Sequence, residues 1–227
     1  MHNIQVGSLV LNGQLIFYFW FGTAGWLMLH YRNRNQRVQE EVLPLLTNAF
    51  WLWMVIWKAS YLLFYPVEVI RRPISLLYYD GGERGAWLAA LAAVVYIWRA
   101  ASKRNIIFMA LVDGLIIYML AGYLASRILL LLTGVEHIWF HLTSLVLALV
   151  LLILLQTTRA ANLPAARRFV YVVWFCIGHI VLWFFISERQ TWFLSFNKQQ
   201  VFFLITAAGL AGMGGLTDNK QKRGLDE

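Results

Sequence analysis

Residues 106–132, with the sequence IIFMALVDGLIIYMLAGYLASRILLLL, decide the fold of this chain. One continuous α-helix of this length extends about 40 Å at 1.5 Å per residue. That length exceeds the hydrocarbon core of a membrane, which is roughly 30 Å thick. The stretch carries two ionisable residues, Asp113 and Arg127, in otherwise mostly apolar surroundings. It is therefore predicted to be a membrane-spanning helix.

The composition of the whole chain agrees with this prediction. Of its 227 residues, 60% are hydrophobic and 13% are charged, whereas soluble domains have about 45–50% apolar and about 25% charged residues. Long apolar runs without strict alternation favour helices over a membrane β-barrel. We predict one all-α integral membrane domain, a bundle of about seven transmembrane helices near residues 9–31, 43–65, 85–98, 106–132, 138–156, 169–187 and 199–216.

The loop charges predict the orientation of the bundle, because cytoplasmic loops are enriched in Lys and Arg. One set of connections carries twelve basic residues: Arg32, Arg34, Arg37, Arg99, Lys103, Arg104, Arg159, Arg167, Arg168, Lys220, Lys222 and Arg223. The opposite set carries five: Arg71, Arg72, Arg84, Arg189 and Lys198. The N-terminus is therefore expected outside and the C-terminus in the cytoplasm.

Several other classes of function are not indicated. The net charge of +8 is spread over short loops, which favours anionic lipid over nucleic acid as the partner. The only cysteine, Cys176, excludes a disulfide framework, and no HxxxH or HExxH spacing indicates a metal site. We expect no cofactor. The opening MHNIQVGS has no Lys or Arg and no cleavage motif, so the first helix is expected to be retained.

Ionisable residues inside membrane helices are functional candidates, because each costs about 2.5–3.5 kcal/mol on insertion. Three stand out: Lys58, Asp113 and Arg127. Asp113 and Arg127 share nearly the same helix face but lie about 21 Å apart along it. Asp113 therefore needs another partner or a proton.

The two cations have two interpretations. Lys58 and Arg127 lie toward the outer ends of their predicted helices, so both could extend their charged ends to the lipid headgroups. If they point inward instead, they form a positive site in the outer leaflet. Such a site suits a phosphate group, for which arginine is the better ligand because it can donate two parallel hydrogen bonds. His141 and His179 lie in the fifth and sixth predicted helices, where a neutral, hydrogen-bonded histidine is the commoner explanation.

Several motifs together resemble the prolipoprotein diacylglyceryl transferase family. The most specific are KASYLLFY at residues 58–65 and the later LYYDGG, which ends at Asp80, Gly81 and Gly82. GSLVLNGQLIFYFWFG is similar to the first helix of the family and LVDGLIIYMLAGYLASR to the fourth. GHIVLWFFISERQ and FNKQQVFFLITAAGLAG are similar to the last two. The family also has seven helices with the N-terminus outside.

The resemblance implies an activity and a set of site residues. Enzymes of this family act in the bacterial plasma membrane, where they transfer diacylglyceryl from phosphatidylglycerol to the cysteine of a secreted lipoprotein precursor. Arg127 matches an essential arginine of the family, and Lys58 stands where the family usually has arginine. Tyr61, Asp80, Gly81 and Gly82 belong to the implied substrate-binding set, and His179 or His141 is a substitute base.

The sequence also departs from the family pattern. After Asp-Gly-Gly the chain reads ERGAWLAA, so Ala86 stands where the family has a functional histidine. Leucines after Arg127 replace the amide-rich Asn-x-x-Asn-Gly-Glu motif, and only TGVEH connects two helices that the family separates by an outer domain. The expected function is therefore phospholipid-headgroup binding by a divergent relative, with or without transfer. The alternative is a non-enzymatic transporter or membrane-complex subunit.

Overall fold

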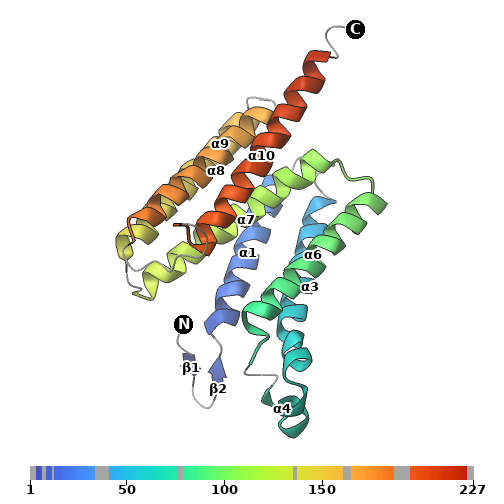
Figure 1. The fold of residues 1–227 in the computed structure, drawn as a ribbon, viewed down its shortest axis with the longest axis vertical. Helices are drawn as coiled ribbons and strands as arrows, with labels where there is room; N and C mark the ends of the chain where they lie inside the picture. The colour runs from blue at the N-terminus through green and yellow to red at the C-terminus, as the bar shows by residue number, and fades with distance from the viewer. Residues whose placement is uncertain are drawn as a thin grey trace. The chain divides into compact units, whose positions relative to one another are not determined.

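The structure is a computed structural model that describes residues 4–6, 9–11, 13–33, 41–75, 79–134, 137–160, 165–186 and 195–223. These residues are mainly helical (Figure 1). Four helices are long and apolar enough to cross a membrane: α3 (Val42–Phe64), α6 (Gly82–Lys103), α7 (Phe108–Leu132) and α8 (Ile138–Ala160). Helix α9 (Ala165–Phe184) contains a shorter apolar segment. The fold is therefore that of a helical membrane protein.

The chain divides into two compact units, Met1–Ser126 and Arg127–Glu227. The first unit begins with an antiparallel hairpin of β1 (Ile4–Val6) and β2 (Leu9–Leu11), followed by α1 (Gly13–Asn33). The helix predicted from residue 9 therefore begins at Gly13. Its expected first turn is instead extended, because the backbone of β2 pairs with that of β1.

Helix α1 is joined to α7 by two long-range hydrogen bonds within the first unit. The indole Nε1 of Trp20 donates to the carbonyl of Ala125 at 3.0 Å, and the hydroxyl of Tyr118 donates to the carbonyl of Gly22 at 3.2 Å. Each bond gives the polar end of an aromatic side chain a backbone partner. These bonds position the two helices that carry Arg32 and Asp113.

Helix α3 packs along α6 in the same unit (Figure 1). The predicted third helix, residues 85–98, is too short at both ends, because α6 runs from Gly82 to Lys103. The polar residues at the two ends of α6 lie outside the apolar segment that hydropathy detects, but their backbone groups still continue the helical hydrogen bonding. Between α3 and α6, the short helix α4 (Pro66–Arg71) begins with a proline, whose fixed φ suits a first helical position.

The second unit contains α8, α9, α10 (Lys198–Arg223) and the last residues of α7. A reciprocal capping arrangement begins α10: Asn197 Oδ1 accepts from the Gln200 amide at 2.7 Å, and Gln200 Oε1 accepts from the Asn197 amide at 3.0 Å. The side-chain Nε2 of Gln200 also donates to the carbonyl of Ile180 at 3.0 Å. Gln200 therefore caps one helix and ties it to α9.

Candidate functional site

The structure places the predicted site residues in two clusters, one in each unit. Arg127, His141 and His179 belong to the second unit. Lys58, Tyr61, Asp80, Gly81 and Gly82 belong to the first. Each cluster has its own internal geometry.

The second-unit cluster is centred on Arg127, near the end of α7. Its Nη1 lies 2.8 Å from Nδ1 of His141 on α8. Its Cζ lies 5.5 Å from the ring centroid of Phe140, which is a cation–π distance. Arg127 is half-buried, so its guanidinium rests against protein side chains. These contacts favour the inward-facing interpretation of this arginine.

The contact with Arg127 determines the proton position on His141. A guanidinium has only donors and stays protonated in proteins. Nδ1 of His141 must therefore accept, which leaves the ring neutral with its proton on Nε2. In this arrangement His141 offers an N–H donor at Nε2, while the lone pair that a general base needs is already used at Nδ1.

His179 on α9 has the opposite tautomer. Its ring is fully buried, and its Nδ1 lies 3.2 Å from the carbonyl of Phe175. A carbonyl oxygen only accepts, so the proton is on Nδ1 and the lone pair on Nε2. The rings of Phe175 and Phe203 lie 4.2 and 4.9 Å from the imidazole and hold it in place. His179 is therefore a buried histidine that carries its ring proton on Nδ1.

The charge of Arg127 acts electrostatically on both His141 and His179. The contact between Arg127 and His141 places a cation beside an N–H donor in the second unit. Such a pair suits an anion such as phosphate. Sequence reasoning named these three residues without distinguishing the roles of the histidines.

In the first unit, the Asp-Gly-Gly turn has a clear structural role. Oδ1 of Asp80 accepts from the Gly82 amide at 2.8 Å, and Gly82 has φ +58, a conformation that favours glycine. The Gly81 amide donates to the carbonyl of Trp57 at 3.2 Å. A Cβ at Gly81 would overlap the hydroxyl of Ser60. The motif thus closes α6 onto α3.

Lys58 and Tyr61 lie on α3 beside this turn. Lys58 is half-buried, and the charge of Asp80 acts on it electrostatically. Tyr61 is only 5% exposed, and its ring stacks on Tyr79 with centroids 5.6 Å apart. Tyr61 therefore packs this end of the unit, and lipid binding by this cluster stays a prediction.

The ion pair between Arg32 and Asp113 is a feature that sequence reasoning missed. Nη2 of Arg32, in the last turn of α1, lies 2.5 Å from Oδ2 of Asp113 on α7, and the two side chains are 6% and 13% exposed. The expectation had left Asp113 with no identified partner and had counted Arg32 as a loop charge. The signal was available, because both residues lie near the same predicted membrane face.

No group of three His, Cys, Asp or Glu side chains that could hold a metal occurs among the residues whose side chains are described. In comparisons with known proteins, no family model, curated protein or solved structure matches the chain. The case for a function therefore depends on the geometry of the two clusters and on the motifs of the sequence.

Proposed function

We propose that this chain is a multi-pass protein of the bacterial plasma membrane that binds a phospholipid headgroup in the outer leaflet through Arg127. The observation that supports this most directly is the contact of Arg127 with His141 inside the second unit. The proposal includes seven spans, with the N-terminus outside and the C-terminus cytoplasmic. It extends the four apolar spans by α1, α9 and α10.

The chemistry of the cluster suits a phosphodiester. The guanidinium can present two parallel N–H groups to phosphate oxygens, and Nε2–H of His141 supplies a further donor. Such bonds are stronger in a site of low dielectric than in water. Phosphatidylglycerol is the proposed ligand because of the motif resemblance, and its acyl chains would remain in the bilayer.

Transfer to a lipoprotein precursor is the further step that this site could perform. A base, for which the motif resemblance suggests His179, would take the proton from the thiol of the precursor cysteine. The sulfur would then attack the glyceryl carbon, forming a C–S bond as the C–O bond to phosphate breaks. Glycerol phosphate would leave with the electron pair of that bond, and Arg127 would stabilise its charge.

Binding without transfer is the competing form of the proposal. It is supported by Ala86 at the position of the family histidine and by the leucines that follow Arg127. Losing one charge-stabilising donor slows such a reaction about 100–1000-fold. A transporter gains no specific support, because Asp113 is engaged with Arg32 on α1.

Native mass spectrometry of the purified protein tests the binding proposal. Phosphatidylglycerol would be titrated against the wild type, Arg127→Gln, Arg127→Lys and the control Arg84→Gln, which removes one exposed charge of the predicted outer side. We expect Arg127→Gln to weaken binding about tenfold or more, as for loss of a charged hydrogen bond. Arg127→Lys should keep part of the affinity. An equal loss of phosphatidylglycerol affinity in Arg84→Gln would contradict the proposal.

A transfer assay separates the two forms of the proposal. Vesicles with labelled phosphatidylglycerol would be mixed with the protein and a precursor peptide, with a Cys→Ser peptide as control. If transfer occurs, His179→Gln should abolish thioether formation while lipid binding persists. No labelled peptide from a lipid-binding wild type would establish the non-catalytic form.

A further inference from the structure

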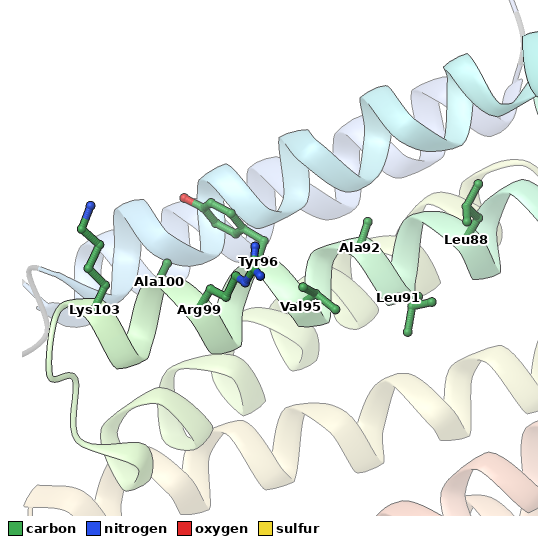
Figure 2. Close-up of a pocket in the computed structure, with 8 residues that line it drawn as sticks. All are labelled: Leu88, Leu91, Ala92, Val95, Tyr96, Arg99, Ala100 and Lys103. Atoms are coloured by element: carbon green, nitrogen blue, oxygen red, sulfur yellow. The ribbon is translucent and has the colours of Figure 1, made fainter.

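Helix α6 carries a groove of about 560 Å³ along one of its faces, within the first unit (Figure 2). Its lining follows helical spacing, with residues three or four positions apart. The lining residues used below are Leu88, Leu91, Ala92, Val95, Arg99 and Lys103. One continuous stripe of α6 therefore forms this surface.

The groove has two chemically different parts. Its first three turns are apolar, and its last turns carry the two cations, Arg99 and Lys103, both exposed (Figure 2). Tyr96 places an amphipathic ring between the two parts. The distance along the helix from Leu88 to Arg99 is about 16 Å. This is close to half of a 30 Å hydrocarbon core, which is the depth of one leaflet.

An ordinary lipid-facing surface explains part of this pattern. Leu91 is 64% exposed and Val95 43%, as expected for side chains that face acyl chains. Basic residues at a helix end also occur simply as topological signals. The added observation is the pocket along this face, whose lining includes the small side chains of Ala92 and Ala100.

We propose that the α6 groove binds one anionic phospholipid, with its phosphate at Arg99 and Lys103 and an acyl chain along Leu88, Leu91 and Val95. Charge complementarity selects the anionic headgroup, since each nearby cation attracts anionic lipid. The apolar length selects a lipid over a soluble phosphate. In the proposed orientation this lipid belongs to the cytoplasmic leaflet. The groove site does not depend on the Arg127 site.

The test is native mass spectrometry in the Arg127→Gln background, so that the Arg127 site contributes nothing. Phosphatidylglycerol and phosphatidylcholine with the same acyl chains would be titrated. We expect phosphatidylglycerol to be retained preferentially. Lys103→Gln should reduce that preference about fivefold, and Arg99→Gln should do so similarly, as for one surface cation each. Arg104→Gln is the matched control, because it removes the adjacent charge outside the groove.

A second variant tests the apolar part without changing charge. Ala92→Phe should fill the groove and reduce phosphatidylglycerol retention, while its thermal unfolding checks that the protein stays folded. Glycerol phosphate in excess should not displace the lipid. The groove site is overturned if both lipids bind equally. The same holds if Arg104→Gln reduces the preference for phosphatidylglycerol as much as Lys103→Gln does, or if folded Ala92→Phe retains phosphatidylglycerol unchanged. It is also overturned if glycerol phosphate competes fully.

Discussion

Two arginines of this helical protein have partners of different kinds, one charged and one neutral. Arg32 on α1 meets the carboxylate of Asp113 on α7 in the first unit, and both side chains are nearly buried. Arg127 in the second unit meets the neutral ring of His141 and the face of Phe140. The first contact joins opposite charges. The second joins a positive charge to a neutral imidazole and an aromatic face.

This difference is consistent with the proposal that Arg32 serves structure and Arg127 serves binding. A carboxylate partner offsets a buried positive charge and locks two helices together. A neutral imidazole orients the guanidinium through one hydrogen bond without adding a negative charge, and a guanidinium is a group that suits anion binding. Two arginines in apolar helices thus have different electrostatic surroundings because their neighbours differ.

The largest expected effect comes from breaking the Arg32–Asp113 pair. Arg32→Met leaves a nearly buried carboxylate without this partner, which should destabilise the protein by about 3–5 kcal/mol. The double variant Arg32→Met, Asp113→Leu should recover most of that loss. Thermal unfolding in detergent measures both. Equal stability of the wild type and the single variant would show that the pair is not a lock.

Close packing at the Asp-Gly-Gly turn should give the next largest effect. A Cβ at Gly85 would overlap the hydroxyl of Ser60 on α3, so Gly85→Ala should cost about 1–3 kcal/mol through overpacking. Ser60→Ala in the same chain removes the overlapping atom and should restore most of the stability. Unfolding midpoints of the four proteins in this cycle give the coupling. If the stability losses caused by Gly85→Ala and Ser60→Ala simply added in the double variant, the proposed contact would be refuted.

The matched change in the second unit should have a smaller effect on stability. Arg127→Met removes a charged hydrogen bond to a neutral ring and should destabilise the protein by about 1.5–3 kcal/mol, less than the loss of the Arg32–Asp113 pair. It should nevertheless remove phosphatidylglycerol binding at that site. Unfolding and lipid titration of Arg127→Met and Arg32→Met, side by side, test the comparison. A loss of stability as large as that of Arg32→Met would reverse the assignment of Arg127 to binding.

The smallest expected effect concerns the position of the ring proton, which should differ between His141 and His179. We expect the Nε2–H tautomer at His141 and the Nδ1–H tautomer at His179. Nitrogen-15 NMR of histidine-labelled protein distinguishes them, with His141→Gln and His179→Gln used for assignment. Finding Nδ1–H at His141 would be incompatible with its contact to the guanidinium.

Apolar length predicted the existence of the long helices well, and their ends less well. Residues 106–132 correspond to α7, which begins at Phe108. The boundary at residue 9 was wrong because strand pairing took Leu9–Leu11. The 85–98 window was too short because a helix continues through polar end residues such as Glu83 and Lys103. Hydropathy measures partition into lipid and does not detect backbone hydrogen bonding.

For the candidate sites too, the sequence predicted part of the outcome and the structure decided the rest. The cost of a charge in lipid marks Arg127 and Asp113 as candidates from the sequence alone. The partner of Asp113 remained undetermined because a contact between residues 81 positions apart depends on which helices become neighbours. The Asp-Gly-Gly turn was assigned to substrate binding by resemblance. Its contacts with Trp57 and Ser60 supply a packing reason for the glycines.

The sequence by itself determined the class of this protein, because the apolar length of its segments and the rarity of charge follow from transfer free energies alone. It also determined which few side chains had to be explained. Only the tertiary structure decided that Arg32 neutralises Asp113, that Arg127 rests on His141, and that the two histidines hold their protons on different nitrogens. Those outcomes depend on distances between helices, and a hydrogen bond or ion pair exists only at those distances.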